Sequence, residues 1–142
     1  MRSAGRPIRW PVIVGALLGG VVLGAMSHQL LAASPSFTET PLYRADLAGV
    51  DKHELIISRL ETTAGWSHGR HYHVGHELVS VLEGVGTLEV EGAPAQRLQP
   101  GTVAHVPPGR IHAGRNASRT AAFKFLLIRT HVKGEPMSIE LN

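Results

Sequence analysis

The chain contains no cysteine among its 142 residues. Disulfide bridges are therefore excluded, and stability must come from a packed core or from an oligomer. Thiolate ligands are excluded as well, so any metal site has to use nitrogen and oxygen donors. The length is sufficient for one domain.

Acidic residues are absent from the first 33 positions, which contain Arg2, Arg6 and Arg9. An uncharged apolar run over residues 11–26 follows these arginines. This order is typical of a secretory signal peptide and predicts cleavage after Ala33, which would leave the protein in the periplasm or outside the cell. The alternative is an uncleaved membrane anchor formed by residues 10–33.

An excess of positive charge is lacking in the rest of the chain. The whole sequence has 14 basic and 11 acidic residues, and the segment 1–33 contributes three arginines and no acid. The remaining residues therefore balance, with 11 of each sign. Binding to nucleic acid has no electrostatic support, so no nucleic-acid partner is expected.

Internal repeats are absent too, and short apolar segments alternate with Gly- and Pro-containing turns. This pattern predicts an all-β barrel or sandwich. Residues 34–41 are polar and bounded by proline, so we predict a flexible lead-in there and a folded domain over residues 42–142. The expected strands include residues 53–62, 77–83, 87–91, 96–98, 103–106, 120–132 and 137–141.

Histidine, glutamate and glycine are grouped in a first block over residues 65–84. Side chains alternate along an extended segment, so His71 and His73 share a face. Gly75 lets the chain turn before Glu77 opens the next strand. The block therefore offers two imidazoles and one carboxylate as candidate ligands.

A second block covers residues 101–116, and sixteen residues separate it from the end of the first block. Its Pro107-Pro108-Gly109 segment forces a turn just before His112 and brings this imidazole back toward the first pair. Three imidazoles and one carboxylate form a donor set that suits Mn, Fe, Ni, Cu or Zn.

At these positions the chain resembles the cupin superfamily. The first cupin motif is Gly, five residues, His-x-His, three or four residues, Glu, six residues, Gly. The second motif is Gly, five residues, Pro-x-Gly, two residues, His, three residues, Asn. All ten fixed positions match: Gly65, His71, His73, Glu77, Gly84, Gly101, Pro107, Gly109, His112 and Asn116. One frequent preference is missing, since Thr102 stands where the family often has Asp.

The resemblance implies a single cupin domain, with the double-stranded β-helix (jelly-roll barrel) of that family. It implies a mononuclear 3-His/1-Glu site for a divalent transition metal, held by His71, His73, Glu77 and His112. Four ligands on a six-coordinate ion leave two positions open, which favours a metalloenzyme of the dioxygenase or isomerase type acting on a small organic substrate. The alternative is a non-catalytic module that binds a small molecule or the metal itself. A homodimer is a further expectation from the resemblance.

Other polar residues beside the motifs are candidates for the chemistry. His68 and His76 are predicted catalytic acids or bases, because the imidazole pKa lies near 6.5. Exposed loop histidines are the alternative for both. Arg110, Arg115 and Arg119 are candidates to attract an anionic substrate, the alternative being a solvated basic face.

Overall fold

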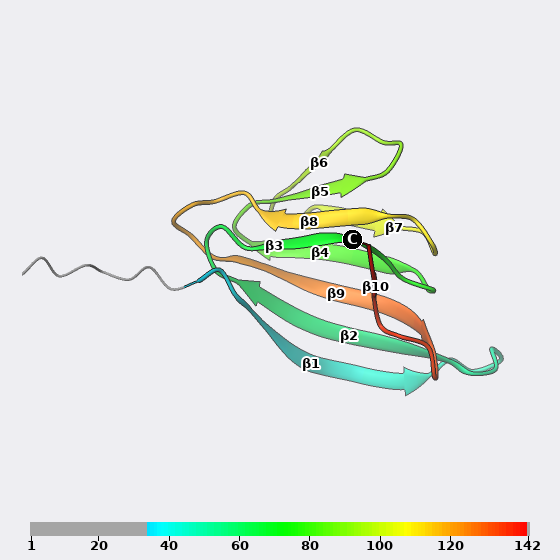
Figure 1. Cartoon of the computed structure of the whole chain (residues 1–142). Coiled ribbons are helices and arrows are strands. Elements are labelled where there is room, and N and C mark those ends of the chain that lie inside the picture. The colour runs from blue at the N-terminus through cyan, green and yellow to red at the C-terminus, as the bar shows by residue number, and fades with distance from the viewer. Residues whose placement is uncertain (1–33, 142) are drawn as a thin grey trace, which may run out of the picture. The chain divides into compact units, whose positions relative to one another are not determined.

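The computed structural model describes residues 34–141 (Figure 1). Within these residues all regular structure is β-strand, which confirms the all-β prediction. No helix there has the length and the apolar character to cross a membrane. The predicted signal peptide or anchor over residues 1–33 lies outside the described residues, so its cleavage stays a prediction.

Over residues 34–141, ten strands form two five-stranded antiparallel sheets, an arrangement consistent with a cupin β-sandwich. The first sheet has the order β1-β2-β9-β4-β7, and the second has the order β10-β3-β8-β5-β6. The strands are β1 (Phe37–Asp46), β2 (His53–Thr62), β3 (Ser67–Tyr72), β4 (Glu77–Glu83), β5 (Gly86–Val90), β6 (Gln96–Leu98), β7 (Val103–Val106), β8 (His112–Asn116), β9 (Phe123–Val132) and β10 (Ile139–Glu140).

The core joins the inward faces of the two sheets, and β9 shows the pattern most clearly. Burial alternates along this strand, so that Phe123, Phe125 and Leu127 point inward. The rings of Phe123 and Phe125 contact each other with centroids 4.9 Å apart. Burying each such side chain contributes about 1.5–3 kcal/mol. The same cluster contains Leu60, Val79, Val81, Leu88, Leu98, Ala104 and Val106.

The ends of β9 and β10 differ slightly from the prediction. The late strand begins at Phe123 and not at Thr120. Ser118 explains the difference, because its hydroxyl oxygen accepts the backbone N–H groups of Thr120 and Ala121 and closes a turn. The last strand is reduced to Ile139–Glu140, which pairs with the end of β3.

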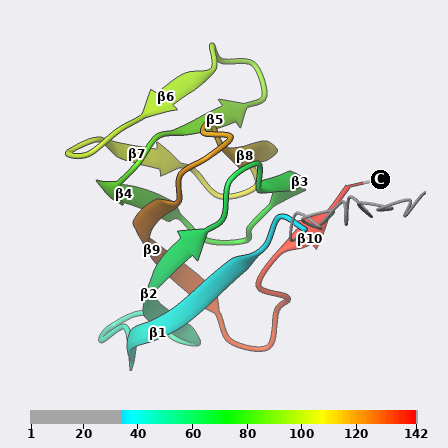
Figure 2. The same cartoon turned by 90° about the vertical axis from the view of Figure 1, so that its left-hand side faces the viewer.

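The prediction of a flexible lead-in over residues 34–41 is wrong for most of that segment. Phe37 begins β1, which pairs with β2 along its whole length and lies at the edge of the first sheet (Figure 2). Proline suggested a loop because it lacks a backbone donor. An edge strand tolerates this loss, and the register shifts between Pro41 and Tyr43.

Candidate metal centre

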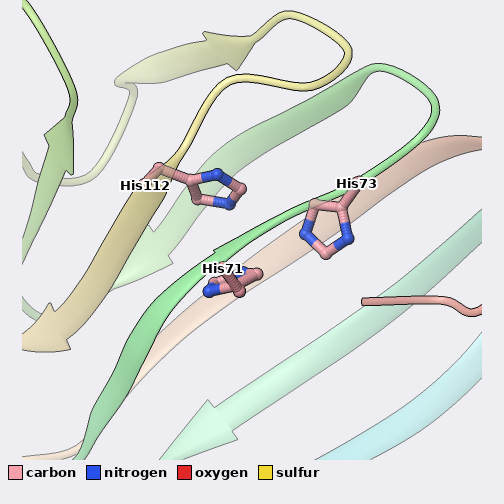
Figure 3. Close-up of side chains that lie close together, drawn as sticks. All are labelled: His71, His73 and His112. Carbon is pink, nitrogen blue, oxygen red and sulfur yellow. The ribbon is translucent and has the colours of Figure 1, made fainter. Parts of the chain in front are cut away.

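Strand ends bring the four predicted ligands together. His71 lies in β3, His73 follows that strand, Glu77 is the first residue of β4 and His112 the first of β8. His71 and His112 are direct partners in the β3–β8 pairing. Figure 3 shows the three imidazoles, carried by neighbouring segments, pointing toward one another.

The turn before His112 is closed by Gly109. This glycine has a φ of 71°, a left-handed conformation that side chains disfavour. Its N–H donates to the carbonyl of His73 over 2.8 Å. The Pro-Pro-Gly turn is thereby fixed directly to the first motif, as the sequence predicted.

The four side chains are all buried. One ring nitrogen of each histidine lies within 4.8 Å of those of the other two. The carboxylate of Glu77 adjoins the same point, with Oε2 2.9 Å from His73 Nε2 and Oε1 3.4 Å from His112 Nε2. The three imidazoles thus form one group and Glu77 adjoins two of them; we call these four side chains the His/Glu cluster.

Backbone carbonyls orient all three imidazoles in the same way. The Nδ1 of His71 lies 2.7 Å from Gly69 O, that of His73 lies 2.6 Å from Met137 O, and that of His112 lies 2.9 Å from Arg110 O. A carbonyl oxygen can only accept, so each Nδ1 carries the proton. The lone pair of every ring is then on Nε2, and metal-binding histidines are commonly held by such contacts.

The Nε2 atoms of His73 and His112 have no hydrogen-bond partner within the part of the chain that the structure describes. Glu77 lies 2.9 and 3.4 Å from these two nitrogens, but with the proton on Nδ1 neither Nε2 has a hydrogen to donate to the carboxylate. A buried acceptor without a partner is unfavourable unless something else binds it. Two orphaned nitrogen atoms beside a carboxylate fit a divalent cation, so this cluster can hold a metal ion.

The pKa values of the titratable groups in the His/Glu cluster shift in different directions. Burial alone would raise the pKa of Glu77, but the neighbouring His112 and His73 outweigh burial and hold that pKa below its usual range. Burial lowers the pKa of His71 to about 4. For His112, burial also acts to lower the pKa, yet the Glu77 carboxylate outweighs it and the pKa is raised. An ionised carboxylate and a neutral His71 are the protonation states that a cation requires.

A family model described as a cupin domain matches residues 59–129, which is half of the chain. The chain belongs to the cupin family. No curated protein matches the sequence.

Solved structures with a similar fold include a lyase and a cupin-like protein. The DMSP lyase DddQ from Ruegeria pomeroyi is 25% identical, with a TM-score of 0.58, over 73% of this chain and 51% of that one. This cupin thus spans about half the length of that lyase. A cupin-like protein from Thermotoga maritima is 22% identical, with a TM-score of 0.54, over 75% of this chain and 79% of the other. KdgF from Halomonas is 18% identical, with a TM-score of 0.51, over 65% and 77%.

A cavity of about 210 Å³ opens beside the His/Glu cluster of this cupin. Its walls are mainly apolar and come from the core strands, with Leu60, Val79, Phe123, Phe125 and Leu127 among them. An engineered cavity of roughly 150 Å³ is large enough for benzene, so this one suits a small organic molecule.

Only one of the two predicted acid–base histidines lies at this cavity. His68 lines it, stacks on His71 with centroids 3.9 Å apart, and has Nε2 3.2 Å from Glu140 Oε1. His76 is exposed and does not line the cavity; its Nδ1 lies 2.9 Å from His105 Nε2. The alternation that turns Glu77 inward turns its neighbour His76 outward. The structure does not bring His76 to the site.

The motif residue Asn116 has a structural task. Its amide nitrogen donates to the carbonyls of Thr63 and Ala121, at 3.0 and 2.9 Å, and its oxygen accepts the N–H of Ser118 at 2.8 Å. This buried amide therefore links three segments at one end of the two sheets.

Sequence reasoning missed two charged residues that line the cavity, Glu39 and Arg129. Of the three arginines predicted to attract an anion, only Arg115 lines the cavity, and it is exposed and paired with Glu89 over 2.7 Å. Arg129 could have been found by alternation, since it continues the inward face of Phe123, Phe125 and Leu127. Glu39 was hidden by the lead-in prediction.

Proposed function

We propose that this cupin is an exported metalloprotein with a mononuclear 3-His/1-Glu centre, and that it acts as an enzyme on a small organic substrate. One observation carries the proposal: three imidazoles converge, Glu77 lies beside two of them, and each Nδ1 faces a backbone carbonyl. A structural histidine needs no such common orientation. The apolar cavity next to the cluster supplies a place for the substrate.

His71, His73, Glu77 and His112 would hold the ion, and all four line the cavity. When bound, a divalent transition metal supplies Lewis-acid activation of a substrate oxygen. The chain itself contributes a water-poor wall of aliphatic and aromatic side chains, which strengthens electrostatic interactions at the site.

His68 is the residue we assign to proton transfer. Among the residues that the structure describes, it is the one histidine outside the His/Glu cluster that lines the cavity. Its Nε2 lies 3.2 Å from Glu140 Oε1, a contact that orients the imidazole ring. The other ring nitrogen is then the atom that gives or takes a substrate proton.

Several reaction classes suit this arrangement. Dioxygenase and isomerase chemistry follow from the family resemblance, and the similarity to a DMSP lyase adds elimination. A non-catalytic binding module is the second candidate, favoured by the exposure of both partners in the His68–Glu140 pair, 42% and 55%. An exposed ion pair is a weaker candidate for catalytic proton transfer than a buried pair.

Metal analysis of purified variants tests the metal assignment. The wild-type protein should bind about one equivalent of a divalent transition metal, and His112→Ala should lose most of it. His105→Ala is the matched control, because this histidine is exposed and lies outside the cluster. Undiminished occupancy in His112→Ala would overturn the assignment, since this residue is the second motif's contribution to the cluster.

Turnover assays separate the enzyme from the binding module. The metal-loaded protein is screened for oxygen uptake with phenolic and β-dicarbonyl compounds, and for isomerisation or elimination by NMR of the same mixtures. For a substrate that reacts, His68→Ala should lower kcat while leaving metal occupancy unchanged. Full metal occupancy without turnover of any compound would favour the binding module.

A further inference from the structure

Arg129 is a buried cation inside a largely apolar cavity. Only 9% of its surface is exposed, although arginine is among the residues least often buried. Its Nη2 donates to Glu39 Oε1 over 2.9 Å. Its Nε is buried and has no hydrogen-bond partner within residues 34–141. A buried guanidinium with an unused donor is unfavourable, and a catalytic or binding role is one reason for a structure to retain it.

The position of Arg129 relates it directly to the His/Glu cluster. Arg129 and Glu77 are register partners in the β9–β4 pairing, and both side chains face inward. Directly opposite residues in an antiparallel pair have Cβ atoms about 4.5–5.5 Å apart. Both residues line the same cavity. A small molecule bound to the guanidinium therefore reaches the cluster with its other end.

We propose that Arg129 binds the carboxylate of a small organic monoacid, and that the rest of this ligand occupies the apolar cavity beside the His/Glu cluster. This inference rests on the proposed function for the role of the cluster, and names the substrate class of that site. A planar carboxylate matches the parallel N–H groups on one edge of a guanidinium.

The two carboxylates near Arg129 favour a ligand that carries one negative charge over a ligand that carries two. Glu39 lines the cavity and contacts Arg129, and Glu77 lies across the β4–β9 pairing. A dianion such as a phosphate ester would meet both carboxylates, and like charges at short range repel. The apolar walls, including Leu60, Val79 and Phe125, accept a hydrocarbon body.

Glu39 sets the strength of this interaction. Its carboxylate accepts one hydrogen bond from the guanidinium and belongs to the edge strand β1. It therefore competes with an incoming carboxylate for the same cation. Removing its charge should strengthen acid binding, whereas removing the charge of Arg129 should weaken it.

Calorimetric titration with acetate, butyrate and benzoate, each paired with its neutral amide, tests the proposal on the full chain. At least one acid should bind more tightly than its amide. Arg129→Gln should weaken the binding of that acid by roughly tenfold or more, as for a lost charged hydrogen bond, and leave the amide unchanged. Glu39→Gln should strengthen acid binding. Arg119→Gln is the control, because this arginine is exposed and does not line the cavity.

Each titration is made with metal-free and with zinc-loaded protein, and zinc content is measured in the same samples. Arg129-dependent acid binding in a protein that takes up no zinc would uphold this inference and overturn the metal function. Zinc binding with equal affinities for acids and amides, or with no acid bound at all, would overturn this inference alone. Acid binding that requires zinc and is unchanged in Arg129→Gln would also overturn this inference alone. Should Arg129→Gln not fold, unchanged acid binding in Glu39→Gln would overturn the inference.

Discussion

The imidazole of His73 donates its Nδ1 proton to the backbone carbonyl of Met137 over 2.6 Å, across 64 positions of sequence. This contact ties the first cupin motif to the segment that leads into β10. That segment is further held by pairing between Ile139–Glu140 and the end of β3. The C-terminal residues thus help to orient a candidate ligand although they supply none to the His/Glu cluster.

Removal of residues 137–142 should therefore weaken metal binding without deleting a ligand of the cluster. Loss of a contact that orients a ligand typically lowers metal affinity by about 10- to 100-fold. Competition with a chromophoric chelator measures the change. Met137→Ala is the control, since it keeps the carbonyl and removes only a side chain that is exposed. Equal affinity in the truncated and full-length proteins would show that this carbonyl does not orient His73.

A bound metal should stabilise the folded protein. The ion binds the assembled cluster better than the unfolded chain, which adds about 2.7 kcal/mol to the free energy of unfolding at 100 times Kd. Thermal unfolding with added zinc, and again after EDTA, measures this shift as a reversible rise in Tm. The Glu77→Gln protein should respond much less, because it lacks the anionic ligand. An identical rise in both proteins would indicate binding elsewhere, for instance at the exposed His76–His105 pair.

Much of the fold and of the metal cluster is predictable from the sequence, because both depend on local patterns. Residues 53–62 are compatible with helix or strand, and their short length and the loop after them predict a strand with the bounds of β2. Turn residues likewise predict the segment 96–98 with the bounds of β6. Motif spacing predicts that the four ligands meet. The spacing succeeds because Gly109 and the surrounding turn fix His112 relative to His73.

The residues that sequence analysis did not find depend on contacts between segments that are distant in the sequence. Glu39 lies in a segment whose prolines suggest a loop, and only pairing with β2 reveals it as part of an edge strand. The carbonyl of Met137 has no signature at all, since every residue has a carbonyl. Arg129 stands out once β9 is known to be buried on one face, because an arginine then continues an apolar row.

The aromatic pair in β9 should be a main contributor to stability. Phe123 is 2% exposed and packs on Phe125. Phe123→Ala should lower the free energy of unfolding by about 3–5 kcal/mol, through lost burial and the cavity that remains. Urea unfolding followed by circular dichroism measures the loss. Leu82→Ala is the comparison, since Leu82 is 47% exposed and its truncation should change stability by about 0.5 kcal/mol or less. Similar losses in both variants would contradict the assigned core.

The last prediction concerns Glu54 and the pH dependence of stability. Arg44 donates from Nε and Nη2 to the two carboxylate oxygens of Glu54, both over 2.7 Å. The carboxylate is buried while the guanidinium is largely exposed, at 4% and 65%. These hydrogen bonds lower the pKa of Glu54 below its ordinary value of 4.5, and burial opposes them less strongly. The folded protein therefore holds this proton less tightly than the unfolded chain does.

A group with a lowered folded-state pKa contributes stability that is fully present above its unfolded pKa and is lost as the pH falls through the folded value. Glu54→Gln should thus be less stable than the wild type at pH 7, and the difference should shrink as the pH falls below 4. Urea unfolding at pH 7, 5 and 3 in EDTA measures the free energies without a metal contribution. Glu91→Gln is the control, because Glu91 and its partner Arg70 are both exposed, and exposed pairs contribute little. A Glu54→Gln difference that is the same at pH 7 and pH 3 would show that its charge does not stabilise the fold, and that only the shape of the side chain matters.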